Sequence, residues 1–252
     1  MKDNFSKQSS LYAQFRPHYP GELFNWLYGH VRQFEAAWDC GTGNGQVAKI
    51  LSGKFKEVYA SDISEKQISQ APILSNVRYV PEPAEECGAG DAAFDLIVVA
   101  QSVHWFDFER FYAEVRRTLR PGGLLALVGY DRLRTDPEVN RILDHFYWDV
   151  VGPYWDAERK LVDDRYTTIP FPFEEIPAPV FQMTFTWSYE RFIGYLNTWS
   201  AVQHYIKQNG ENPVDLHLKE FEASWGSGEK EVMFPVFMRV GFSDIHPSPG
   251  KR

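Results

Sequence analysis

Apolar residues in the first half of the chain gather in five short runs that alternate with polar or amphipathic stretches. The runs are EAAWDC (35–40), FKEVYASD (55–62), NVRYV (76–80), AFDLIVVA (93–100) and GLLALVGY (123–130). Continuous apolar segments such as LIVV and LLALV are typical of strands that are covered on both faces of a parallel sheet. With two further strands expected at 180–188 and 232–242, the pattern predicts an α/β fold. We expect a Rossmann-like, seven-stranded, mostly parallel sheet with helices on both faces.

Helical periodicity fills the intervals between these runs. Residues 22–34 carry an apolar face, residues 46–53 form a short helix that ends at Gly53, and residues 108–119 form a strongly amphipathic helix. Ser64 and Gln67 have the spacing of a capping box, and Asp107 stands where it can cap the helix at 108–119.

The pattern changes after Asp131. Asp136 and Pro137 open an amphipathic helix, a proline- and aromatic-rich stretch follows to about residue 180, and a long helix is expected from Ser188. Pro235 lies inside the last predicted strand, which favours an edge or bulged position for that strand.

The composition of the chain excludes several classes of protein. The chain has 252 residues, 44% of them hydrophobic, and a formal charge of −8. It can bury one large core, and it offers no basic stripe for a nucleic acid. Cys40 and Cys87 are too few for a disulfide framework, no HExxH motif or carboxylate cluster indicates a metal, and no apolar run is long enough to span a membrane. We expect a soluble, cytoplasmic, metal-free protein that does not bind membranes.

The stretch DCGTGNGQVA (39–48) stands where the first strand turns into a helix. Its three alternate glycines allow a tight turn and a close approach by a ligand. Gln46 occupies the position of the third glycine of a dinucleotide fingerprint, and the acid at Asp39 would repel phosphate. An acid there suits a ligand with an ammonium or sulfonium group, and Asp62, at the end of the second strand, suits a ribose diol.

These features resemble the class I S-adenosylmethionine-dependent methyltransferases over roughly residues 10–130. The segments FRPHYP, AQSVHWFD, LRPGG and YLNTWSAVQHY look closest to the type 11 small-molecule branch, which includes trans-aconitate methyltransferases. The resemblance implies one domain over residues 1–252. Its parts are an N-terminal lid and helix (1–34), a cofactor-binding core (35–130), an aromatic cap insertion (131–180) and C-terminal strands with a long helix (181–252).

The resemblance also implies roles for individual residues. The methionine part of S-adenosyl-L-methionine would lie against Asp39 and the loop, the ribose on Asp62 and the adenine on Ile63. Ala84 and Glu85 match the family's adenine-reading segment, although Pro83 stands where an acid is common and Glu82 is an alternative reader. Ala100 and Gln101 would pass under the sulfonium. The full predicted cofactor set is Asp39, Gly41, Thr42, Gly43, Gly45, Asp62, Ile63, Ala84, Glu85, Ala100 and Gln101.

Three residues, His104, Arg16 and Tyr19, lead the candidates for the substrate side, and the helix with Tyr195, Trp199, His204 and Tyr205 is the other candidate. His104 packs at the start of a helix, positions the substrate, or acts as a general base; a base is needed only if the accepting atom carries a proton. Arg16 and Tyr19 belong to the lid that the family folds over its cofactor, and Arg16 could bind a carboxylate with two hydrogen bonds. Arg159 and Arg165 are further candidates for binding an anion, although such residues are usually solvated.

The sequence therefore predicts a methyltransferase that acts on a small organic metabolite with a carboxylate or hydroxyl acceptor, as a monomer or homodimer. Two alternatives stay open. One is a methyltransferase for a protein or lipid-like partner, and the other is a catalytically silent protein that binds the cofactor.

Overall fold

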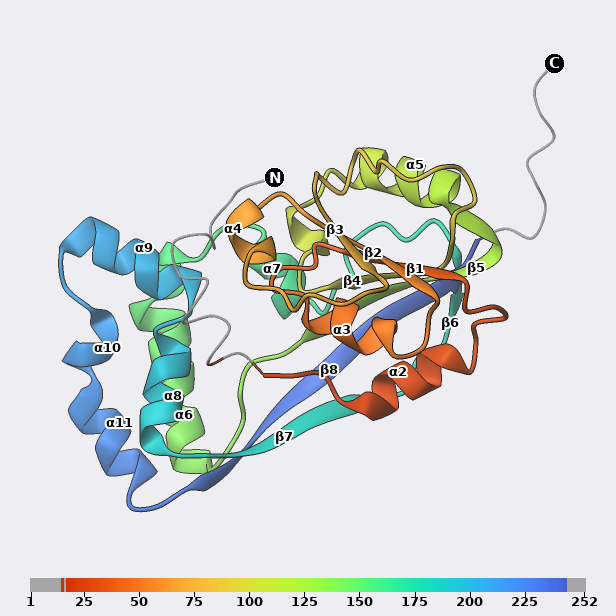
Figure 1. The fold of residues 1–252 in the computed structure, drawn as a ribbon. Coiled ribbons are helices and arrows are strands. Elements are labelled where there is room, and N and C mark those ends of the chain that lie inside the picture. The colour runs from red at the N-terminus through yellow and green to blue at the C-terminus, as the bar shows by residue number, and fades with distance from the viewer. Residues whose placement is uncertain (1–14, 16, 244–252) are drawn as a thin grey trace.

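The computed structural model describes residue 15 and residues 17–243. One sheet forms the centre, with strand order β3-β2-β1-β4-β5-β8-β6, and β7 also pairs with β8 (Figure 1). The first five strands pair in parallel, whereas β8 runs antiparallel to β5, β6 and β7. The strands are β1 (Ala36–Cys40), β2 (Glu57–Asp62), β3 (Val77–Pro81), β4 (Phe94–Ala100), β5 (Leu119–Tyr130), β6 (Glu174–Ile176), β7 (Phe181–Trp187) and β8 (Lys230–Phe242).

Helices cover both faces of this sheet, with α5 on one side and α2 and α3 on the other (Figure 1). The α-helices are α2 (Gly21–Tyr28), α3 (Gln46–Ser52), α4 (Glu65–Ile68), α5 (Phe108–Thr118), α6 (Pro137–His145), α7 (Arg159–Asp163), α8 (Tyr189–Leu196), α9 (Ser200–Asn209), α10 (Pro213–Leu216) and α11 (Leu218–Trp225). Two 3₁₀ turns, η2 (Val103–Trp105) and η4 (Gly152–Tyr154), and one π-helical turn, η3 (Phe146–Val150), complete the set.

The apolar runs have the two-sided burial that their composition predicts. In β4, Leu96 and Val98 belong to the core cluster beneath α2 and α3, whereas Ile97 and Val99 belong to the cluster beneath α5. The predicted caps are also present, since Ser64 accepts a hydrogen bond from the backbone of Gln67 and Asp107 caps α5. The Rossmann-like, mostly parallel fold is therefore confirmed.

The sheet differs from the prediction in having eight strands instead of seven. The short β6 pairs with the end of β8 around Val240, and β7 pairs with its beginning, from Lys230 to Val236. Because β8 is 13 residues long, its outer edge accommodates both. The segment before β7, which looked like pure insertion, thus contributes one strand to the sheet.

The predicted edge or bulged position for the strand with Pro235 was wrong, because β8 is paired on both sides and its register with β7 runs through Pro235 without a shift. The carbonyl of Pro235 accepts a hydrogen bond from the backbone of Asp131 on the β5 side, and the last β5 pair is Tyr130 with Val236. In a strand, the nitrogen and the carbonyl of one residue point to the same side. The missing N–H of Pro235 therefore falls where β5 has already ended.

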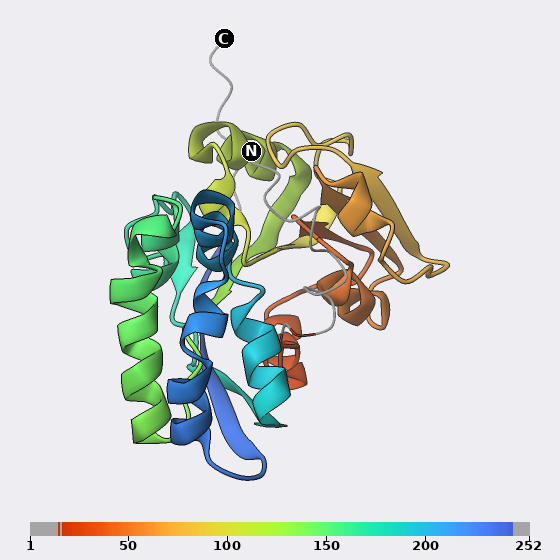
Figure 2. The same cartoon turned by 90° about the vertical axis from the view of Figure 1, so that its left-hand side faces the viewer.

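A layer of helices lies beside the sheet, and Figures 1 and 2 agree that α6, α8, α9, α10 and α11 form it. The single long helix expected from Ser188 is instead four helices, α8 to α11. Gly210 ends α9 with a left-handed backbone, and Pro213 begins α10. Since α11 packs on α6 and α9 on η4, this helical layer is built from two parts of the chain. No helix in the described residues is long and apolar enough to cross a membrane.

Candidate cofactor and substrate site

The glycine loop, residues 41–45, follows β1 and leads directly into α3. Backbone hydrogen bonds from Gly41 and Thr42 to the carbonyl of Ser61 hold its start against the end of β2. All three glycines adopt positive φ, at +74°, +55° and +79°. The loop therefore needs glycine on backbone grounds alone, because other residues adopt this region only with strain.

The surroundings of the three glycines differ. A Cβ on Gly41 would meet Ser102, and a Cβ on Gly45 would meet Tyr79 and Ala71, so these two glycines are required by packing within the protein. A Cβ on Gly43 would meet nothing within 4 Å. Only this middle glycine presents backbone to open space, and it is the part of the loop that fits a ligand.

Asp39 lies beneath the loop and is 1% exposed. Its Oδ2 accepts hydrogen bonds from the hydroxyl of Thr42, at 2.5 Å, and from the backbone of Ala48 in α3, at 2.8 Å. Burial raises the pKa of this carboxyl from its ordinary 3.8 to about 7, the two hydrogen bonds oppose the shift, and the charge of Asp62 adds to it. Asp39 thus joins the loop to the helix, and its carboxyl is close to half-protonated at pH 7.

Asp62 ends β2 with its carboxylate beside the glycine loop. One oxygen accepts the backbone N–H of Gly43 at 2.9 Å, and the other accepts that of Ser64 at 2.9 Å. These two bonds fix the orientation of the carboxylate beside the glycine loop. Next to it, Ile63 is partly exposed and belongs to neither core cluster, so its side chain can lie against an adenine.

The residues predicted to read the adenine, Ala84 and Glu85 with Glu82 as the alternative, follow the end of β3. Ala84 is 3% exposed and packs in the core. Glu85 uses Oε1 to accept the backbone N–H of Asp107, and Glu82 accepts that of Gly88. Both acids therefore have structural partners, and the choice of the residue that reads the adenine stays a prediction.

The end of β4 forms the opposite wall. Ser102 donates a hydrogen bond to the carbonyl of Cys40, which ties this wall to the end of β1. Gln101, after the partly exposed Ala100, has a φ of +56°, unusual for a residue with a side chain, and its amide donates to the carbonyl of Tyr130. Backbone strain of this kind concentrates at functional sites.

His104 lies in η2 and is 8% exposed. Its Nδ1 is 3.2 Å from the hydroxyl of Tyr166, which also donates to the side chain of Gln101 at 3.4 Å. Burial, helped by the positive charge of Arg159, lowers the pKa of His104 to about 3. The ring is neutral at physiological pH, and a pKa this low makes it a weak base, so it is better suited to a hydrogen bond with a substrate than to removal of a proton.

The described part of the N-terminal segment touches three parts of this site. The His18 ring is 3.1 Å from the side chain of Gln46 at the start of α3, and the Tyr19 ring packs edge-on against Tyr130. A Cβ on Gly194 of α8 would clash with the ring of Phe15, so the two are in close contact. Residues 15 and 17–20 thus join the core to the helical layer. Arg16 lies outside the described residues.

The sequence missed Tyr166 as a member of the site. It lies in a polar turn of the insertion, where no spacing or periodicity marks it, and reaches the site through a positive φ of 60°.

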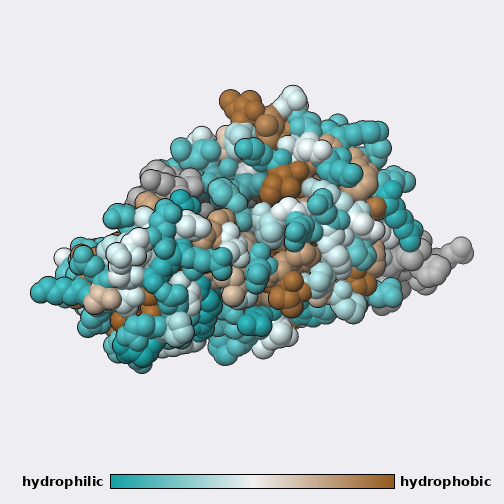
Figure 3. Space-filling view, turned by 90° about the horizontal axis from the view of Figure 1, so that it is seen from below, coloured by the Kyte–Doolittle hydropathy of each residue, from teal (hydrophilic) through white to brown (hydrophobic). Residues whose placement is uncertain are grey.

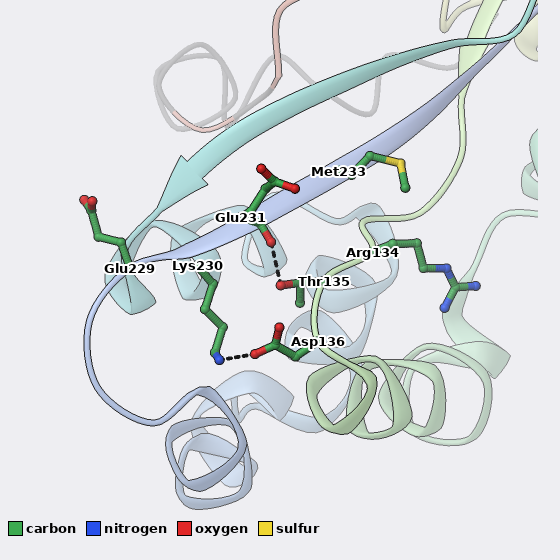
Figure 4. Close-up of a pocket in the computed structure, with 7 residues that line it drawn as sticks. All are labelled: Arg134, Thr135, Asp136, Glu229, Lys230, Glu231 and Met233. Atoms are coloured by element: carbon green, nitrogen blue, oxygen red, sulfur yellow. Dashed lines mark hydrogen bonds and ion pairs between the residues drawn. The ribbon is translucent and has the colours of Figure 1, made fainter.

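A surface pocket of about 490 Å³ lies elsewhere (Figure 4). Its lining residues are Arg134, Thr135, Asp136, Glu229, Lys230, Glu231 and Met233. Lys230 is paired with Asp136, and Arg134 with Asp144 at 3.0 Å. None of the predicted site residues lines it.

A glycine turn after the first strand and an oriented acid after the second are typical of nucleoside-binding proteins of the Rossmann-like class, whose ligands lie at the carboxyl edge of the parallel strands. The family model described as "Methyltransferase domain" matches residues 38–127. A methyltransferase from Dictyostelium discoideum is 31% identical over 245 residues, which cover 94% of this chain and 93% of that protein.

An uncharacterised methyltransferase of Mycobacterium tuberculosis is 30% identical over 70% of this chain and 68% of its own length. A solved structure of a type II methyltransferase from Anaeromyxobacter dehalogenans is 39% identical, with a TM-score of 0.85, and covers 92% of this chain and 100% of that chain. This chain belongs to the class I S-adenosylmethionine-dependent methyltransferases, and S-adenosyl-L-methionine is its cofactor.

Proposed function

We propose that the protein transfers the methyl group to a small organic metabolite, as in the type 11 small-molecule branch. The observation that carries this proposal is the contact of Phe15, His18 and Tyr19 with α8, α3 and β5. We infer that a segment held at these three points lies over the site, between the core and the helical layer. A covered site suits a ligand that can be enclosed, whereas a macromolecular acceptor needs an open groove.

Within this site, we assign the cofactor to the edge formed by the glycine loop and the end of β2. The open backbone at Gly43 would receive the methionine part, Asp62 the ribose hydroxyls and Ile63 the adenine. Asp39 would favour the ammonium group, because a nearby positive charge stabilises a carboxylate that burial has brought to a pKa of about 7.

On the acceptor side, the chain's contribution is alignment. Methyl transfer is an in-line displacement, and holding two reactants in line can contribute about 7 to 11 kcal/mol in favourable cases. Gln101, His104 and Tyr166 form one connected polar wall that can orient an acceptor. A carboxylate acceptor needs no base, and the low pKa of His104 fits that case better than a hydroxyl acceptor.

A lipid-like or protein partner is less well supported. Four large apolar side chains are strongly exposed in the described residues, Ile73, Trp148, Val180 and Leu216, and they come from four separate segments. On the face shown in Figure 3, hydrophilic side chains predominate and apolar ones are scattered. A docking surface for such partners is usually one continuous apolar patch.

The test is methyl transfer from labelled cofactor to a panel of small acids, phenols and amines, run beside a quinone and a protein extract. Label in a small-molecule product is the expected result. Label only in protein or quinone would overturn the proposed acceptor class. Cofactor binding without transfer to any acceptor would favour a silent binding protein.

A further inference from the structure

Arg159, in α7, is a charged residue held inside the aromatic part of the cap. Its guanidinium lies 4.9 Å from the ring centre of Trp155 and 5.5 Å from that of Tyr147. Its side chain is 21% exposed. Trp199 packs against both aromatic rings, at 5.6 Å and 5.5 Å. The sequence favoured a solvated surface position for Arg159, and the structure contradicts it.

Neighbouring side chains hold the guanidinium of Arg159 through its Nε atom. Its Nε donates to the hydroxyl of Tyr147 at 2.7 Å and lies 3.3 Å from Asp163. The Tyr147 hydroxyl itself donates to Asp163 at 2.8 Å, so the three groups lock one orientation. None of the hydrogen bonds in the described part of the chain uses the two Nη atoms of Arg159.

This arrangement differs from that of the other cations in residues 131–176. Those side chains bring an Nη or Nζ atom to a carboxylate, and the pairs are Arg132 and Arg134 with Asp144, Arg141 with Glu138, Lys160 with Asp164, and Arg165 with Asp131. Arg159 alone in this segment leaves the outer fork of its guanidinium without an anion.

Arg159 is also close to the methyl-transfer wall. Helix α7 packs against η2, which carries His104, and the charge of Arg159 contributes to the lowered pKa of that histidine. The charge of Arg159 also interacts with Tyr195 of α8. The residue therefore stands between the helical layer and the end of β4.

A further donor in the same aromatic group lacks an acceptor. The indole Nε1 of Trp155 is buried and makes no hydrogen bond in the described structure. Buried donors without acceptors are unfavourable and are usually satisfied by a water or a ligand. A free guanidinium fork and an unsatisfied indole N–H both favour an anionic oxygen ligand.

We propose that Arg159 is a specificity-determining residue that binds a carboxylate of the acceptor, with Tyr147 and Asp163 as its positioning residues. A guanidinium binds a carboxylate with two parallel hydrogen bonds, which matches the free fork. One guanidinium already shared with Asp163 suits a single carboxylate better than a doubly charged phosphate. The aromatic rings beside it select an acceptor with an apolar body. This proposal rests on the small-molecule methyl transfer proposed above.

The test compares small carboxylic acids with their amides as acceptors, with aliphatic, aromatic and dicarboxylic members in the panel. The wild-type protein is expected to methylate at least one acid in preference to its amide. Arg159→Gln should raise KM for that acid by about 10- to 100-fold, with a smaller change in kcat, because a charge-assisted hydrogen-bond pair is lost. Arg159→Lys should fall between, since it keeps the charge and loses the fork.

Lys160→Gln is the matched control, because Lys160 is a neighbouring, exposed cation in the same helix. Its KM is expected to stay at the wild-type value. Unchanged affinity for S-adenosylhomocysteine shows that each variant is folded, and Arg159→Lys serves if Arg159→Gln does not fold. An unchanged KM in folded Arg159 variants, or a preference for amides, phenols or amines over acids, would overturn the role of Arg159 and leave the proposed function standing. No turnover of any small molecule by the wild type would instead refute the proposed function, and the Arg159 role with it.

Discussion

The buried carboxyl of Asp39 should make the stability of the protein depend on pH in a way that one substitution removes. Burial raises its pKa from 3.8 to about 7, so the folded state holds a proton that the unfolded state has released between those values. Stability is then highest below the unfolded pKa and falls as the pH rises to the folded pKa. Three pKa units correspond to about 4 kcal/mol, of which roughly 3 kcal/mol falls between about pH 5 and pH 8.

Asp39→Asn is a suitable perturbation, because a single oxygen of Asp39 accepts the bonds from Thr42 and Ala48 and the amide oxygen of Asn can accept both. The assay is urea unfolding of the cofactor-free protein at about pH 5 and about pH 8. Carboxyls that do not interact with Asp39 titrate equally in both proteins, so the difference between the two pH dependences reports Asp39 together with its smaller coupling to Asp62. We expect the wild type to lose roughly 3 kcal/mol more than the variant over this range. Equal losses in the two proteins would refute the argument.

Two further predictions concern the loop and the substrate wall. Gly43→Ala should cost about 1 kcal/mol of stability for its left-handed backbone, and it should also weaken binding of S-adenosylhomocysteine in calorimetry. Gly210→Ala, at a φ of 76° with open space around it, is the control that loses stability only; if both variants bind equally well, Gly43 does not face the cofactor. With a pKa of about 3, His104 stays neutral from about pH 5 upwards, so the pH dependence of kcat should be the same in His104→Gln as in the wild type. An inflection near neutral pH that disappears in the variant would make His104 the general base.

Much of the core could be predicted from sequence because its signals are local. Alternation of apolar runs with helical periodicity gave β1 to β5, and the spacing of Ser64 from Gln67 and the position of Asp107 gave two helix caps that the structure contains. The glycine loop and Asp62 were predicted to bind parts of one cofactor, and in the structure a hydrogen bond joins Gly43 to Asp62, because the carboxyl ends of parallel strands share one edge.

The second half depends on contacts between distant segments, which local patterns do not encode. Pro235 indicated an edge strand. Whether its missing N–H matters depends on where the neighbouring strand β5 ends, and that strand ends at Tyr130, 105 positions earlier in the chain. Likewise, the chemistry of Arg159 depends on which aromatic rings surround it in the folded chain. Tyr166 therefore became visible as a neighbour of His104 only in the folded chain. The sequence named Arg159 as an anion partner but favoured a solvated position, and only the fold placed it beside η2.

Calorimetric titration of S-adenosylhomocysteine into the wild type, Asp62→Ala and Asp62→Asn tests the central claim that the end of β2 and the glycine loop form the cofactor site. Glu57→Ala, at the exposed opposite end of β2, is the control. Asp62→Ala would remove two charge-assisted hydrogen bonds to the ribose, so the Kd for S-adenosylhomocysteine should rise by at least about 100-fold. Asp62→Asn should lose less, because it keeps an acceptor for the backbone of Gly43, and the control should bind as the wild type does. A Kd that is the same in Asp62→Ala as in the wild type would contradict the account.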